Sequence, residues 1–472
     1  MKLGFIVVLF FIVPFVCISQ TAEDFYNSGN NYVQNQEYTE AIVSYTKSIN
    51  KDANFLDSYF NRALAKEKLF DVRGAIRDYT TIISLNKKHI QAYNNRGVLK
   101  MELGDYEGAS ADFSQAIQIA PKYESALFNQ ALLLSKQEKL SEAYNLYSKI
   151  IEINPKHALS YYNRAILNIR MQNKQKAIAD LTNYINLAPS DTDALHMLAF
   201  LNISNQNYTD AVTQFSTINS IEPENYRALY NKGCANFLRG NYMNCVNDFR
   251  KAITINPSFQ EAYFNRGVAR IYLEDFSGAI VDFTQAIQLN PNDTSAYVNR
   301  GFAYLNIQDT LTAIADFTKA TQISDSYEAA FYNRALANIE TNNISYAIHD
   351  FMRVTEINPN NLDVLNSLAY IQVQNNKPNE AIETLTKALA IAAGNQDILL
   401  NRAMLRYETK HYKEAIDDFT ELLNNAAHGT NYYYRGLAKI YMLDLDGGCE
   451  DLSVSGELGM EDAYVQIKKH CN

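Results

Sequence analysis

The sequence predicts an all-α chain of about thirteen helical hairpins, because prolines and small residues recur with one period of 34 residues. Prolines lie one period apart at Pro121, Pro155, Pro189, Pro223, Pro257 and Pro291, and Pro359 lies two periods further on. A first series of small residues keeps the same frame: Gly29, Ala63, Gly97, Ala131, Ala165, Ala199, Gly233, Gly267, Gly301, Ala335, Ala369 and Ala403. A second series follows twelve residues later: Ala41, Ala75, Ala109, Ala143, Ala177, Ala211, Cys245, Ala279, Ala313, Ala347, Ala381 and Ala415. Two small sites in each period predict two closely packed helices, because helix backbones approach each other only where side chains are small.

An aromatic residue follows the second small site by four residues in most periods, and we expect it to wedge between successive hairpins. The positions are Tyr79, Phe113, Tyr147, Phe283, Phe317, Phe351 and Phe419. Each hairpin is expected to end at its Asn-Pro step, because the residue before proline disfavours the helical conformation and proline cannot continue the hydrogen-bond ladder.

This pattern resembles the tetratricopeptide repeat from residue 22 to about residue 456, and the copy EAYFNRGVARIYLEDFSGAIVDFTQAIQLNP carries its small, aromatic and proline positions together. The resemblance implies a right-handed α-solenoid, a superhelix of antiparallel helix pairs whose first helices line a concave groove. We expect repeats 1 to 12 within residues 20–428 and a thirteenth repeat, offset by one residue, at 429–456. A C-terminal capping helix is expected within 457–472, because terminal repeats must present a polar outer face.

Residues 1–19 are predicted to be a secretory signal peptide. They contain one lysine, an apolar run from Leu3 to Val16, and a Cys-x-Ser step that ends at Ser19, where we expect cleavage. The run is shorter than the roughly 20 apolar residues of a transmembrane helix. Acylation of Cys17, which would make a lipoprotein, is disfavoured because Val16 replaces the small residue usual before such a cysteine. An uncleaved anchor is the remaining alternative. The protein is therefore predicted to cross a bacterial inner membrane and to be periplasmic or associated with the outer membrane.

Composition and motifs argue against several classes of function. Hydrophobic residues make up 47% of the chain and charged residues 20%, as in an ordinary folded protein. The net charge is −10, and no dense run of Lys or Arg could follow a phosphate backbone, so nucleic acid is not an expected partner. The seven histidines are scattered without metal-ligand spacing, and no phosphate-binding glycine loop is present. We therefore predict no enzyme activity, no metal and no cofactor.

A basic residue in the first helix is followed sixteen residues later by aspartate in nine repeats. The pairs are Arg62 and Asp78, Arg96 and Asp112, Arg164 and Asp180, Lys232 and Asp248, Arg266 and Asp282, Arg300 and Asp316, Arg334 and Asp350, Arg402 and Asp418, and Arg435 and Asp451. The other four repeats lack both members: Ser28 and Ser44, Gln130 and Leu146, Leu198 and Gln214, and Leu368 and Thr384. This covariation predicts a structural ion pair that fixes the register of each hairpin. An exposed pair would contribute about 0 to 1 kcal/mol.

The first-helix positions that the family points inward are rich in aromatic and apolar residues, most densely in repeats 5 to 10. They are Phe128, Tyr162, Ile166, Phe200, Tyr230, Phe237, Phe264, Tyr272, Phe302, Tyr332 and Tyr370. Such a groove suits an amphipathic helix or an extended segment with apolar anchors. The alternative is that many of these rings are buried between adjacent hairpins. We find no cluster of Lys, Arg and Asn of the kind that grips a C-terminal carboxylate in some tetratricopeptide adaptors.

An asparagine precedes the basic residue in most repeats and is expected to bond locally or to the next hairpin. These residues are Asn61, Asn95, Asn129, Asn163, Asn231, Asn265, Asn299, Asn333 and Asn401.

Four cysteines follow the predicted signal peptide, an even number that fits an oxidising compartment. The C-terminal segment resembles the end of many secreted bacterial tetratricopeptide proteins, and this resemblance implies a disulfide between Cys449 and Cys471. Cys245 replaces a packing alanine, so Cys234 and Cys245 are expected to be buried small residues. A bond between these two remains open.

The leading hypothesis is an exported, non-enzymatic scaffold that binds a partner protein along the aromatic groove. The second is a permanent subunit of an envelope or secretion assembly, and a weaker third is a binder of glycan or peptidoglycan, because tyrosines can stack on sugars. The sequence specifies neither the partner nor the oligomeric state, since a repeat scaffold hosts many functions.

Overall fold

The computed structural model describes residues 20–471, which form 27 α-helices and no strand. They divide into two compact units, unit 1 up to Ile221 and unit 2 from Glu222. The predicted signal peptide, its cleavage site and Cys17 lie outside the described residues. None of the helices within 20–471 is long and apolar enough to span a bilayer.

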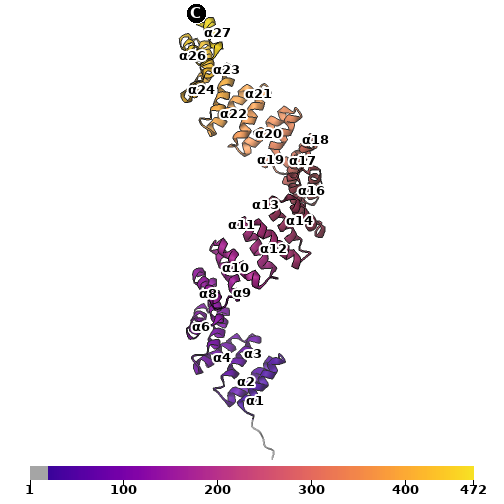
Figure 1. The fold of residues 1–472 in the computed structure, drawn as a ribbon, viewed down its shortest axis with the longest axis vertical. Coiled ribbons are helices and arrows are strands. Elements are labelled where there is room, and N and C mark those ends of the chain that lie inside the picture. Colours follow the sequence, from indigo (N-terminus) through magenta and orange to yellow (C-terminus); the bar gives the residue numbers. More distant parts are fainter. Residues whose placement is uncertain (1–19, 472) are drawn as a thin grey trace, which may run out of the picture. The chain divides into compact units, whose positions relative to one another are not determined.

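Each unit is a stack of antiparallel hairpins that follow one another in chain order, an α-solenoid as predicted (Figure 1). Unit 1 contains α1 (Ala22–Gln34), α2 (Tyr38–Lys51), α3 (Leu56–Lys68), α4 (Val72–Leu85), α5 (Ile90–Glu102), α6 (Tyr106–Ile119), α7 (Glu124–Lys136), α8 (Leu140–Ile153), α9 (Ala158–Arg170), α10 (Lys174–Leu187), α11 (Thr192–Ser204) and α12 (Tyr208–Ile221).

Unit 2 has seven hairpins and a terminal helix. Its helices are α13 (Tyr226–Leu238), α14 (Tyr242–Ile255), α15 (Gln260–Tyr272), α16 (Phe276–Leu289), α17 (Thr294–Asn306), α18 (Thr310–Ile323), α19 (Glu328–Glu340), α20 (Ile344–Ile357), α21 (Leu362–Gln374), α22 (Pro378–Ile391), α23 (Gln396–Glu408), α24 (Tyr412–Asn425), α25 (Gly429–Tyr441), α26 (Leu445–Glu457) and α27 (Glu461–His470). In each hairpin the odd-numbered helix is the first helix.

Two local devices end the helices. The second helix stops before its Asn-Pro step as predicted: α8 ends at Ile153, and Asn154 turns to φ −136°, ψ 91°. The first helix ends at a residue with positive φ, which the sequence analysis did not anticipate. This residue is Gln36, Phe70, Gly104, Glu138, Gln172, Gln206, Gly240, Glu274, Gln308, Asn342, Asn376, Lys410 or Leu443 in repeats 1 to 13. The left-handed residue lets following backbone N–H groups cap the last carbonyls of the helix, so the turn keeps one shape although glycine occupies it only twice.

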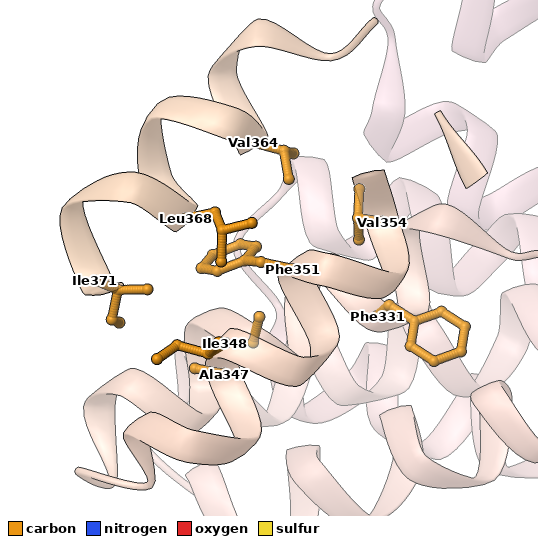
Figure 2. Close-up of a cluster of buried hydrophobic side chains, with 9 residues drawn as sticks. Phe331, Ala347, Ile348, Phe351, Val354, Val364, Leu368 and Ile371 are labelled. Carbon is orange, nitrogen blue, oxygen red and sulfur yellow. The ribbon is translucent and has the colours of Figure 1, made fainter. Parts of the chain in front are cut away.

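In ten of the thirteen hairpins the core contains an aromatic ring four residues after the second small site, and Leu181, Leu385 or Leu452 takes its place in the other three. A Cβ added to Gly267 would lie 2.8 Å from Phe283 Cε1, so no side chain fits there without displacing the ring. Phe283 also belongs to one buried cluster with Ala303 of the next hairpin, which agrees with the expected wedge. Figure 2 shows the corresponding Phe351 beside Leu368 of the following hairpin. Each ring therefore closes its own hairpin and packs against the next.

The basic residue and aspartate of all nine predicted pairs are bonded. Repeat 9 shows the geometry. Arg300 donates from Nε and Nη2 to the two oxygens of Asp316 at 2.8 and 2.7 Å, and its guanidinium lies over the Tyr297 ring. Burial alone would lower the pKa of the Arg300 guanidinium, but the hydrogen bond and charge of Asp316 outweigh it and raise that pKa. Both partners are largely buried, so the estimate made for an exposed pair does not apply.

The arginine also reaches a third helix. Arg300 Nη1 donates to Thr284 Oγ1 at 3.1 Å, and Thr284 lies on the second helix of the preceding hairpin. Seven repeats make this bond to a threonine or serine. The predicted role was to fix hairpin register across the array, and this bond links the arginine directly to the preceding hairpin.

A second donor, four residues after the first, bonds the same aspartate. It is a base in five repeats, where Lys66, Lys100, Arg270, Arg406 and Lys439 pair with the aspartate. Two repeats without the ion pair keep a neutral bond at this level. Asn202 donates to Gln214 at 3.2 Å, and Thr384 donates to Gln372 at 2.9 Å. In these two of the four repeats that lack the ion pair, a neutral hydrogen bond joins the two helices instead.

The C-terminus of unit 2 is closed by α27. A disulfide joins Cys449 of α26 to Cys471, with 5.9 Å between their Cα atoms. Beneath it, Ala463 of α27 is buried in one cluster with Leu437 and Leu452 of the last hairpin. The helix thus covers an end of the stack that would otherwise expose its core.

We expect Asp316→Ala to lower the free energy of unfolding by about 3 to 5 kcal/mol, because it leaves the buried Arg300 without its counter-charge. The double variant Arg300→Leu/Asp316→Gln copies Leu198 and Gln214 of repeat 6 and should cost clearly less. Urea unfolding followed by far-UV circular dichroism measures both. Equal losses in the two variants would mean that the unpaired charge is not what destabilises the single variant.

Removing the disulfide with Cys449→Ser/Cys471→Ser should destabilise the docking of α27 by about 3 kcal/mol, the loop-closure value for a loop of this length. Hydrogen exchange of the α27 amides should then accelerate while that of α13 to α24 stays unchanged. Cys234→Ala/Cys245→Ala removes two thiols without removing a bond and serves as the control. Unchanged α27 exchange in the serine variant would show that packing alone holds this helix.

Candidate protein-binding face

Five of the ten aromatic residues predicted to line the groove belong to the core. They are Phe128, Tyr162, Tyr230, Phe264 and Tyr332. Each is half-buried, and its ring centroid lies 5.1 to 5.9 Å from a ring on the second helix of its own hairpin. The alternative of rings buried in the hairpin packing therefore describes these five.

The other five predicted groove residues lie nearer the surface. Phe200, Tyr272, Phe302 and Tyr370 are exposed, whereas Phe237 is half-buried with its edge against Tyr272. Phe200 belongs to unit 1 and the remaining four belong to unit 2. Of the ten predicted residues, the four exposed rings offer the most surface to a partner.

Unit 2 carries two apolar rows on its first helices. The residue after each small core residue is apolar in six consecutive hairpins, as Cys234, Val268, Phe302, Leu336, Tyr370 and Met404. The residue three positions later is also apolar, as Phe237, Ile271, Leu305, Ile339, Val373 and Tyr407. Residues three apart share one face of a helix, so we call these two rows the first-helix face. Phe302, Leu336 and Tyr370 on it are 41%, 37% and 69% exposed.

The groove prediction had selected aromatic rings and Ile166, and it did not include Leu336, Val373 or Met404. The signal was present in the sequence as a column of aliphatic residues in one register of the repeat.

Pockets lie between consecutive first helices. The α19–α21 pocket, about 540 Å³, is lined by Tyr327, Glu328, Ala329, Tyr332, Asn333, Asn361, Asp363 and Val364. The α21–α23 pocket, also about 540 Å³, is lined by Asn366, Ala369, Tyr370, Val373, Gln374, Leu385, Asn395, Asp397, Ile398, Asn401, Met404, Leu405 and Glu408. In unit 1 the α1–α3 pocket, about 490 Å³, is lined by Asn30, Val33, Gln34, Tyr38, Tyr45, Asn61, Leu64, Ala65, Glu67 and Lys68. Each mixes apolar walls with amides, as binding sites for peptide segments do.

The recurrent asparagine before the basic residue lines all three pockets, as Asn61, Asn333 and Asn401. Its bonds vary. Asn333 donates to the Ala329 carbonyl one turn back in its own helix, whereas Asn61 donates to Asn30 of the preceding hairpin. A bond within the helix or to the next hairpin was expected. The bond of Asn61 goes instead to the preceding hairpin.

Cys234 and Cys245 are free thiols, and Cys245 is fully buried. Burial raises the pKa of the Cys234 thiol to about 11 and that of Cys245 to about 12. Both are therefore protonated and unreactive at neutral pH, consistent with a packing role.

Comparison with known proteins agrees with this architecture. Models of the tetratricopeptide repeat match residues 90–123, 226–259 and 261–293, residues 372–440, residues 146–179 and 283–315, and residues 124–157. Together they cover more than half of the chain. The chain belongs to the tetratricopeptide-repeat family. Tetratricopeptide arrays typically act as non-enzymatic scaffolds that bind other proteins. No curated protein matches the chain.

Several solved tetratricopeptide proteins are similar in fold. One from Parabacteroides merdae is 23% identical, covers 52% of this chain and 98% of its own, and has a TM-score of 0.32. PilF of Pseudomonas aeruginosa is 17% identical, and the match covers 43% of this chain and 92% of PilF with a TM-score of 0.38. YrrB, described as having an unusual peptide-binding site, is 21% identical. The match covers 39% of this chain and 95% of YrrB, with a TM-score of 0.35.

We expect Phe264→Ser and Phe302→Ser to differ in stability although both residues were predicted to line the groove. Phe264 packs on Phe283, so its loss should cost about 2 to 4 kcal/mol, whereas loss of the exposed Phe302 should cost under about 1 kcal/mol. Thermal unfolding by circular dichroism distinguishes them. Similar losses in both variants would place Phe302 in the core and remove it from the binding face.

Proposed function

We propose that this protein is an exported, non-enzymatic scaffold that binds a segment of a partner protein across the first-helix face of unit 2. The observation that carries the proposal is the row of apolar residues from Cys234 to Met404, which is unbroken over six first helices. Three of its residues, Phe302, Leu336 and Tyr370, are exposed. Soluble proteins rarely expose a contiguous apolar strip without a binding role.

The pockets favour a peptide segment as the occupant. The α21–α23 pocket opens between Tyr370 and Met404, which belong to the exposed row itself. A segment lying along the row could place a side chain in this pocket while its neighbours cover the apolar strip. The centre of binding is therefore placed in repeats 9 to 12, later in the chain than the aromatic count in the sequence had suggested.

Export is proposed from the signal-like residues 1–19 and is supported by the Cys449–Cys471 disulfide. Disulfides persist in oxidising compartments such as the periplasm and are rare in the cytosol. A fusion of residues 1–19 to a periplasmic reporter enzyme would test the signal directly.

Permanent assembly into a larger complex is the second candidate. The second helices of unit 2 also expose large apolar side chains, including Val281, Leu311 and Tyr346. These lie on α16, α18 and α20, outside the first-helix face. A permanent partner would cover such residues, and its complex would survive high salt during purification.

The test is affinity capture from an envelope extract with two matched variants. Phe302→Ser/Leu336→Ser/Tyr370→Ser alters the first-helix face, and Val281→Ser/Leu311→Ser/Tyr346→Ser removes three apolar residues of the second helices that are even more exposed, at 65%, 74% and 70%. We expect the first variant to bind its partner at least about tenfold more weakly, because three apolar anchors are lost, and the second to bind normally.

Both variants must keep the helicity of the wild type by circular dichroism. Loss of the partner only in the second-helix variant would overturn the groove proposal and favour the permanent-subunit alternative. Equal capture by all three proteins would move the interface to a surface outside both sets.

A further inference from the structure

Resting on the proposed function, we infer that the bound segment is cationic, with Lys or Arg side chains entering the α19–α21 and α21–α23 pockets. Each lining contains two carboxylates and no basic residue: Glu328 and Asp363 in one, Asp397 and Glu408 in the other. The α1–α3 pocket of unit 1 offers an internal contrast, because Lys68 balances Glu67 there. Among these three pockets between first helices, the two in unit 2 therefore carry the unbalanced negative charge.

The bases on the three pocket helices are already engaged. Arg334 of α19 is paired with Asp350, and both Arg402 and Arg406 of α23 are paired with Asp418. Helix α21 carries no basic residue, because Leu368 occupies the position of the arginine. None of these helices has a cation left to neutralise a pocket carboxylate.

The pocket carboxylates are correspondingly unpaired. Those of Asp363, Asp397 and Glu408 make no hydrogen bond or ion pair with any residue in 20–471. Glu328 accepts hydrogen bonds from the Asn358 and Asn361 amides at 3.2 and 2.8 Å, which orient it without cancelling its charge. A cationic ligand would find acceptors already in place.

The walls suit the rest of a basic side chain. Tyr332 lines the first pocket, and Tyr370 and Met404 line the second, so both can cover the alkyl stem of Lys or Arg while its charge reaches a carboxylate. An aromatic face adds attraction for the cation. A free polyamine or metal ion would leave these apolar walls uncovered, so the combination favours a peptide with basic and apolar residues.

The two pockets share α21 and belong to consecutive hairpins of one unit, with their linings on the same series of first helices. One extended segment can therefore present one basic side chain to each. Selection would come from charge in the pockets and affinity from the apolar row beside them.

The test is fluorescence anisotropy of the full chain with a labelled peptide in which lysines alternate with leucine and phenylalanine, and with the same peptide carrying glutamine for every lysine. We expect the lysine peptide to bind about tenfold more tightly, equal to about 1.4 kcal/mol. Asp363→Asn/Asp397→Asn/Glu408→Gln should remove most of this difference, because it leaves only Glu328 charged in the two pockets. Glu383→Gln/Glu414→Gln/Asp417→Asn changes the net charge equally on exposed positions of α22 and α24 and should preserve it.

Several results would overturn the inference. They are equal affinities for the two peptides, no binding of the lysine peptide, an equal loss in the α22/α24 variant, or competition by spermidine as strong as that by unlabelled peptide. Equal affinities that both fall in Phe302→Ser/Leu336→Ser/Tyr370→Ser would reject cation selection while leaving the proposed peptide-binding face intact. Whether the first-helix face binds a partner at all is measured separately, by the affinity capture of the natural partner.

Discussion

The structure depends on a buried guanidinium that joins three helices. Arg300 lies on its first helix, bonds Asp316 on the second helix and reaches Thr284 in the hairpin before. The planar fork of arginine suits this arrangement, since its donors point in fixed directions to two acceptor groups. Aromatic rings packed on small residues supply the apolar burial, but such contacts are not directional and do not by themselves fix the angle between two helices. In the seven repeats that make the bond to the preceding hairpin, these directional bonds fix the register of one hairpin on the other.

Repeats that lack the ion pair show why its basic residue and its aspartate are replaced together. An aspartate left alone in this buried position would be an uncompensated charge, and so would a lone arginine. In repeat 6, Leu198 accompanies Gln214, which accepts from Asn202, so the site is neutral and still bonded between helices. The covariation visible in the sequence is therefore a consequence of desolvation: either both charges are buried together or neither is.

The periodic part of this fold was predictable from sequence because each position recurs often enough to reveal its constraint. The small residues, the ring, the helix ends and the ion pairs all follow from the 34-residue frame. The left-handed residue at Phe70 or Leu443 was not predictable, because its identity varies while only its backbone conformation is kept. The burial of each predicted groove residue was not predictable for a related reason. Phe264 and Phe302 are both aromatic residues of first helices, and burial alone separates them.

Structural and binding roles meet at α21. In this repeat Leu368 stands where other repeats have the arginine of the ion pair, and the hydrogen bond between Thr384 and Gln372 joins the two helices instead. Helix α21, which both pockets share, carries no base, and the arginines of α19 and α23 are bound to their own aspartates, so Asp363 faces the pocket without a counter-charge. In a repeat array each hairpin contacts only its neighbours, so one stretch of the first-helix face can differ in charge from the rest.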